Sequence, residues 1–124
     1  MVMHLQFAEL PVSDQDRAKS FYTEKLGCQV VADAPMGEKW RWIELGFEGS
    51  DTALHFVPRE DETPSPDPVL VLVEDDVRST VEALRARGVE IITEPGEAPY
   101  RPGVTVAEFR DSEGNRMVLS EKLR

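Results

Sequence analysis

Aromatic and acidic side chains alternate with other residues between positions 40 and 44 of the chain. Trp40, Trp42 and Glu44 are separated by Arg41 and Ile43. In an extended strand, residues two apart point to the same face of a sheet, so the two indoles and the carboxylate are expected to share one face. Aromatic rings beside carboxylates suit a flat or cationic ligand. The spacing therefore predicts a ligand-binding surface on this strand.

A histidine in the next predicted strand could add acid-base chemistry to that surface. The alternation across residues 52–57 places His55 on the same face as Glu44. Histidine titrates near neutral pH, so His55 and Glu44 are the candidate catalytic pair, as base and orienting group. The alternative is that His55 only lines a cavity, where it is hydrogen bonded or partly wet.

Four further residues are candidates for contact with a ligand. Glu9 and Glu108 lie in other predicted strands and would bring two more carboxylates to the same surface. Tyr100 and Arg101 lie in a predicted loop, residues 95–103, where Tyr100 could act as a lid and Arg101 could reach an anionic group. The same loop also has the composition of an ordinary rigid surface connection.

The elements that must position these residues occur twice, because residues 12–30 match residues 73–91 in sequence pattern. Each half predicts one strand, one helix and three further strands. The strands are expected at residues 4–10, 29–32, 39–47, 52–57, 69–73, 90–93, 105–110 and 115–120. The residues expected to face the helices are Ile43, Leu45, Phe47, Leu54, Phe56, Met117 and Leu119.

Capping residues set the expected limits of the two helices. Ser13 and Asp16 predict a capped start for the first helix, and Gly27 predicts its end. Asp75 or Asp76 predicts the start of the second helix. The apolar stripes are Ala18, Phe21, Tyr22 and Leu26 in the first helix and Val77, Val81 and Leu84 in the second.

Length and prolines define the organisation of the chain. Its 124 residues suit one domain, and a half of about 60 residues has little core of its own. Alternate prolines in residues 63–68 cannot belong to a central strand. We therefore predict a single α+β domain, residues 1–124, with module one at 1–58, a connector at 59–68 and module two at 69–124.

Composition excludes several classes of partner and site. Acids outnumber bases 24 to 14, and the net charge of -10 repels nucleic acid and anionic membranes. Neither a membrane-spanning segment nor a signal peptide is predicted, so we expect a soluble, cytoplasmic protein. The single cysteine, Cys28, cannot form an intrachain disulfide and is expected to pack in the core.

The repeated modules and several short motifs resemble one known family. The motifs are Val12-Ser13-Asp14, Phe21-Tyr22, Leu26-Gly27 and Asp111-Ser112-Glu113-Gly114. Together they resemble the vicinal oxygen chelate superfamily, which includes glyoxalase I, extradiol dioxygenases, fosfomycin-resistance proteins and bleomycin-resistance proteins. The resemblance implies a cupped mixed sheet built from two β-α-β-β-β modules, with helices on the outer face. It also implies a homodimer that holds its ligand inside the cup.

The resemblance further implies metal ligands on the first and last strands of each module. The matching positions here are Phe7, Pro68 or Val69, and Val118, which carry no suitable donor atoms. Only His55, at the fourth position, could coordinate a metal. We therefore expect no cofactor and no usual metal centre, and Phe7 and Val118 become candidates for direct ligand contact.

The resemblance also bears on the kind of substrate. Pro11 stands where glutathione-using glyoxalases place a basic residue, so a glutathione adduct would lose an anchor. Glu9, Glu44 and Glu108 could supply oxygen ligands only to a metal placed elsewhere in the cup. The surface thus favours an aromatic or cationic small molecule.

Three functions fit the sequence. The first is a metal-independent protein that binds a small aromatic or cationic molecule in a dimer cup, as bleomycin-resistance proteins do. The second is an enzyme of the same superfamily, a lyase, isomerase or dioxygenase, with an atypical divalent-metal site or metal-free chemistry by His55 and Glu44. The third is a regulatory or interaction domain whose cup is filled by its own side chains, with Trp40 and Trp42 in core or dimer contacts.

Overall fold

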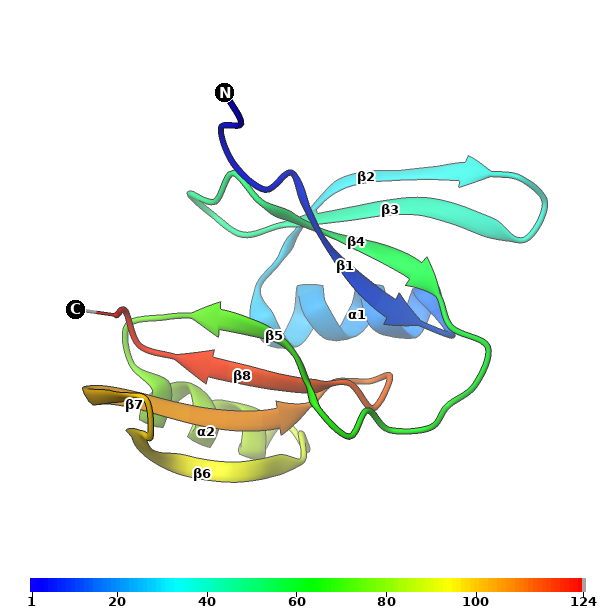
Figure 1. The fold of residues 1–124 in the computed structure, drawn as a ribbon. Helices are drawn as coiled ribbons and strands as arrows, with labels where there is room; N and C mark the ends of the chain where they lie inside the picture. Colours follow the sequence, from blue (N-terminus) through cyan, green and yellow to red (C-terminus); the bar gives the residue numbers. More distant parts are fainter. Residues whose placement is uncertain (124) are drawn as a thin grey trace. The chain divides into compact units, whose positions relative to one another are not determined.

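The computed structural model describes residues 1–123 and confirms the predicted α+β class with two β-α-β-β-β modules (Figure 1). The chain divides into two units, between Glu62 and Thr63, inside the segment predicted to be the connector. The elements are β1 (Phe7–Val12), α1 (Gln15–Leu26), β2 (Gln29–Met36), β3 (Trp40–Gly46), β4 (Ala53–Pro58), β5 (Pro68–Val73), α2 (Val77–Ala86), β6 (Ile91–Ala98), β7 (Arg101–Arg110) and β8 (Arg116–Ser120).

The first unit contains a mixed sheet with the strand order β1-β4-β3-β2. The β1 and β4 strands run parallel, and the β3 strand is antiparallel to both β4 and β2. In this register His55 on β4 lies between Glu9 on β1 and Glu44 on β3. The sheet therefore places the three ionisable residues in one row across three neighbouring strands.

One face of this sheet is covered by α1, and the alternation of apolar residues explains why (Figure 1). The side chains with almost no solvent exposure are Leu10, Val12, Ala18, Tyr22, Ile43, Leu45, Leu54 and Phe56. Burial of this apolar surface stabilises the unit. The β3 strand ends at Gly46, one residue before its predicted end at Phe47, which is half-buried.

The caps of α1 differ partly from those predicted. Asp14, rather than Ser13 with Asp16, is the N-cap, and its carboxylate accepts a hydrogen bond of 3.0 Å from the Arg17 backbone N–H. The Ser13 hydroxyl instead donates to Glu62, and Asp16 pairs with Arg41. The helix ends as predicted at a left-handed glycine, Gly27, with φ of 76°.

The second unit repeats this plan with the strand order β5-β8-β7-β6. Of the two predicted caps of α2, the structure selects Asp76, whose carboxylate accepts from the Ser79 backbone N–H at 3.1 Å. Pro68 begins β5 at the edge of the sheet, where a missing N–H is tolerated. The buried apolar residues include Val77, Val81, Leu84, Ala107, Phe109, Met117 and Leu119.

Two further observations concern the burial of Cys28 and the length of the two helices. Cys28 is buried, as predicted, and burial raises the pKa of its thiol to about 12. Neither helix described in residues 1–123 is long and apolar enough to cross a membrane.

Candidate functional site

Three aromatic side chains from three strands lie together on the face of the first sheet that α1 leaves open. We call Phe7, Trp42 and His55 the aromatic cluster. The Trp42 and His55 rings are tilted by 35° with centroids 3.9 Å apart, which is a close stacking contact. Phe7 lies 5.8 Å from Trp42 and 5.4 Å from His55, measured between ring centroids. The sheet therefore brings together three residues that the sequence placed among the candidates for ligand contact.

His55 is the most buried member of this cluster, and the residue is only 7% exposed. Its Nδ1 atom lies 2.7 Å from Oε2 of Glu9. An ionised carboxylate can only accept a hydrogen bond, so Nδ1 carries the proton in this contact. The other ring nitrogen, Nε2, is buried and has no hydrogen-bond partner in the part of the chain that the structure describes.

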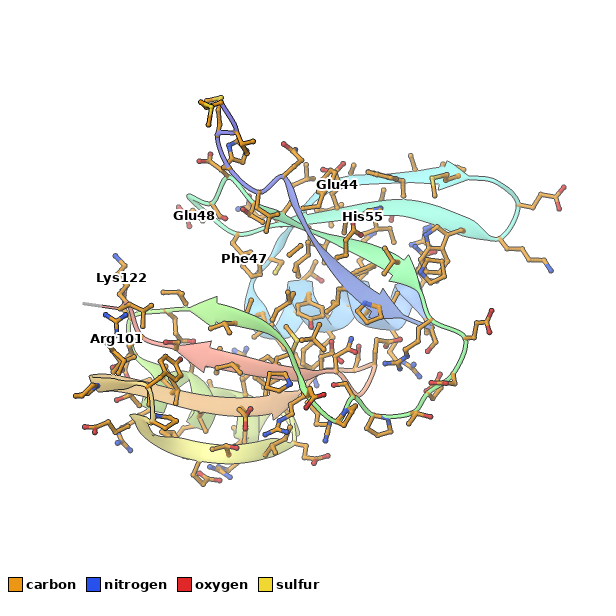
Figure 2. All side chains as sticks on the ribbon, in the orientation of Figure 1. Glu44, Phe47, Glu48, His55, Arg101 and Lys122 are labelled. Atoms are coloured by element: carbon orange, nitrogen blue, oxygen red, sulfur yellow. The ribbon has the colours of Figure 1, made fainter. Side chains whose placement is uncertain are left out.

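The second carboxylate of the row faces the indole. Oε1 of Glu44 accepts a hydrogen bond of 2.6 Å from Nε1 of Trp42. Figure 2 labels Glu44 and His55 on their neighbouring strands β3 and β4. The two predicted catalytic candidates are thus neighbours, but the carboxylate in contact with the imidazole is that of Glu9.

Trp40 lies at the start of β3, where it pairs with Met36 across the strands. It is half-buried and falls two residues before Trp42, on the same face of the strand. The predicted shared face of the two indoles agrees with this position.

Glu108 lies in the second unit and is engaged in an ion pair. Both of its carboxylate oxygens accept from Arg116, at 3.1 Å to Nε and 2.9 Å to Nη2, and Thr93 donates to the same carboxylate. The Arg116 guanidinium holds the pKa of Glu108 below its ordinary value. Val118 lies directly opposite Glu108 on β8.

Arg116 was not among the candidate residues, although its alternation with Met117 and Leu119 places it on the open face of β8. The diagonal contact between Glu108 and Arg116 depends on the strand register, which sequence alone does not supply. The pair neutralises one of the three glutamates expected to face a ligand. Of the three glutamates, Glu9 and Glu44 are therefore the ones whose negative charge is not balanced by a contacting arginine within residues 1–123.

The segment of residues 95–103 is not the predicted loop. Most of it belongs to a hairpin formed by β6 and β7, with Ala98 paired to Arg101. Tyr100 lies at the tip and is 62% exposed, and Figure 2 labels Arg101 where β7 begins. Pro95 and Gly96 are tolerated because β6 is an edge strand, and Pro102 and Gly103 lie in β7 before its pairing with β8 begins at Val106.

Comparison with known proteins identifies the family. Residues 4–119 match the model of the Glyoxalase/Bleomycin resistance protein/Dioxygenase superfamily. The chain belongs to this superfamily. It is 32% identical over 123 residues to the uncharacterized protein YetH of Bacillus subtilis, covering 98% of this chain and all of that protein.

Two further relatives of the superfamily carry functional descriptions. The crystal structure of TnmS3, an antibiotic binding protein from Streptomyces sp. CB03234, has a TM-score of 0.80 and 35% identity, covering 97% of this chain and 96% of that chain. A probable chloroplastic lactoylglutathione lyase of Arabidopsis thaliana is 34% identical over 122 residues. That match covers 90% of this chain but 33% of the plant protein.

The donor atoms at the positions expected for the superfamily's metal do not fit a transition-metal centre. His55 is the one imidazole there, its Nδ1 is taken by Glu9, and the ring of Phe7 packs against it. Such a centre needs two or three protein donors. Across residues 1–123 no group of three or more His, Cys, Asp or Glu side chains is arranged to hold a metal ion.

Proposed function

We propose that this chain binds a small planar molecule, aromatic and neutral or cationic, at the aromatic cluster of the first unit, without the usual metal. The observation that carries the proposal is the half-buried indole of Trp42, which stacks on His55 and donates to the carboxylate of Glu44, while the carboxylate of Glu9 contacts His55. A flat ligand can stack on such rings, and its burial supplies most of the binding free energy.

The charge of the site favours cations and neutral molecules over anions. Glu9 is about half exposed, so its carboxylate can face a ligand as well as His55. Glu44 lies beside the indole, where a cation above the ring would meet both the π face and the carboxylate. An anionic ligand would meet two carboxylates and a chain of net charge -10.

The comparisons support a binding function of this kind. TnmS3, which is 35% identical to this chain over nearly its whole length, is described as an antibiotic binding protein. A second solved structure from the same Streptomyces strain is described as a glyoxalase/bleomycin resistance protein and is 34% identical, with a TM-score of 0.73. Binding of an antibiotic therefore has precedent in a similar chain of similar length.

The proposal includes a homodimer of this chain. Each sheet has edge strands with unpaired backbone groups, and association of copies is a common way to cover them. Sedimentation equilibrium at micromolar concentration should give twice the mass of the 13.9 kDa chain. The monomer mass would contradict this part of the proposal.

Binding can be tested with three probes that share a pair of fused six-membered aromatic rings and differ in charge, namely N-methylquinolinium, 2-naphthol and 2-naphthalenesulfonate. Calorimetric titration should detect the first two and at least several-fold weaker binding of the sulfonate, because of Glu9 and Glu44. The ratio of the affinity for 2-naphthol to that for the sulfonate should fall in Glu44→Gln. The matched variant Glu24→Gln, on α1, should leave this ratio unchanged. Absence of heat and of any change in tryptophan fluorescence with all three probes would instead favour the interaction-domain function.

An enzyme of the same superfamily is the second candidate, favoured by one specific observation. The Glu9 carboxylate orients the His55 imidazole through Nδ1, and an oriented imidazole is the arrangement required of a general base. Metal-free acid-base chemistry would therefore use His55 with Glu9, while Glu44 remains hydrogen bonded to Trp42. For any activity found, an unchanged rate in His55→Ala would remove this candidate.

A further inference from the structure

One nitrogen of the aromatic cluster is left without a hydrogen bond. Nε2 of His55 is buried and has no partner anywhere in residues 1–123. A buried polar atom without a hydrogen bond is destabilising relative to one that is satisfied. Such atoms are rare in folded proteins and call for an explanation in each case.

Glu9 determines what this nitrogen can do. Because the ionised carboxylate accepts at Nδ1, the proton of the neutral imidazole lies on Nδ1 and Nε2 carries a lone pair. Nε2 is therefore a hydrogen-bond acceptor aimed away from Glu9. The flanking rings of Phe7 and Trp42 offer it no donor that the geometry places within reach, since the Trp42 Nε1–H already donates to Glu44.

We propose that the ligand donates an O–H or N–H hydrogen bond to Nε2 of His55, with Glu9 acting as the positioning residue that holds the proton of the neutral imidazole on Nδ1. The inference rests on the proposed function and narrows the ligand to planar aromatics that carry a hydroxyl or an N–H group, such as phenols and aminoaromatics. Phe7 and Trp42 are both half-buried and are the rings in contact with His55, so access of a ligand to Nε2 requires one of these rings to move. The hydrogen bond to Nε2 selects, among the aromatic molecules that can stack on Trp42, those that carry a donor group.

A matched pair of probes tests this inference, namely 2-naphthol and its methyl ether, 2-methoxynaphthalene. Both present the same rings, but only the naphthol has a donor. The full-length chain should bind 2-naphthol roughly two- to tenfold more tightly, which is the value of one ordinary hydrogen bond. His55→Phe keeps a ring in the stack and should abolish the difference between the probes. His4→Phe makes the same change at the other histidine, which is exposed, and should preserve it.

The tautomer supplies an independent measurement. In ¹H–¹⁵N spectra of the imidazole, His55 should show a protonated Nδ1 and an unprotonated Nε2, and Glu9→Gln should shift this balance and reduce the preference for 2-naphthol. Equal affinity of the two probes for the unmodified chain, or a preference that survives in His55→Phe, would overturn the inference while leaving the binding function intact. If neither probe binds, the proposed function fails and the inference fails with it.

Discussion

Glu44 and His55 lie directly opposite each other on β3 and β4, yet it is Glu9 on β1 whose carboxylate contacts the His55 imidazole at 2.7 Å. Glu44 is engaged by the Trp42 indole N–H at 2.6 Å. The two carboxylates therefore have different roles. Glu9 fixes the histidine, and Glu44 fixes the indole on which we propose that a ligand stacks.

Removal of the Trp42 ring should weaken binding of the aromatic probes. In Trp42→Ala the stacking surface is lost, and we expect the affinity for 2-naphthol to fall by about tenfold or more. Trp42→Phe should lose less, because a smaller ring remains. Trp40→Ala serves as the comparison, since Trp40 shares the face but lies two residues before Trp42, at the start of β3. Calorimetry measures all three, and equal losses at positions 40 and 42 would contradict the placement of the ligand.

The Glu108–Arg116 pair should make stability depend on pH. The pKa of Glu108 lies below its ordinary value in the folded chain because Arg116 donates to it, so its contribution is present at neutral pH. That contribution is lost as the pH falls from about 4.5 through the lower folded pKa. Urea unfolding should therefore show that Glu108→Gln is less stable than the unmodified chain at pH 7, with the gap closing in acid. Glu97→Gln, on the exposed side of β6, should show no such pH-dependent gap.

The Asp14 cap should matter more than the neighbouring serine. Asp14→Ala removes the side chain that accepts from the Arg17 N–H and should lower the free energy of unfolding by about 1 kcal/mol. Asp14→Ser keeps a capping oxygen and should recover most of that loss. Ser13→Ala should cost less than Asp14→Ala. A larger effect at Ser13 would restore the cap first inferred from the sequence.

Addition of a transition metal should not change the thermal stability of the chain. The donor set around His55 is too small for a transition-metal centre, so Ni²⁺, Mn²⁺, Fe²⁺ or Zn²⁺ should not raise the melting temperature. Elemental analysis of protein purified without chelators should find well under one equivalent of bound metal. One equivalent, lost in His55→Ala, would favour the atypical metalloenzyme.

Side-chain alternation was sufficient to predict the two faces of the first sheet. It placed Ile43 and Leu45 toward the helix and His55 on the open face, as the structure has them. Alternation could not predict the strand register. The contact between Glu9 and His55 joins residues far apart in the chain, through the pairing of the parallel strands β1 and β4. A pattern of period two states which face a residue occupies but not which neighbour it meets.

Turn-forming residues were less reliable guides. Prolines and glycines predicted a loop at residues 95–103, where the chain forms the β6–β7 hairpin. Such residues break central strands, but Pro95 and Gly96 lie in the edge strand β6, and Pro102 and Gly103 lie in β7 before its pairing with β8 begins. The predicted cap of α1 was one residue away from the observed cap, Asp14. Ser, Asp and Asp at positions 13, 14 and 16 can all cap a helix, so residue type alone does not select one of them.

The indole resonances provide the most direct test of ligand binding at the aromatic cluster. The chain has two tryptophans, so Trp42→Phe assigns the Nε1–H signal of each in a ¹H–¹⁵N spectrum. Titration with 2-naphthol should shift the Trp42 signal saturably, because the ligand stacks on that ring and disturbs its hydrogen bond to Glu44. If the Trp42 signal stays unchanged up to the solubility limit of both 2-naphthol and N-methylquinolinium, the aromatic cluster is not the ligand site.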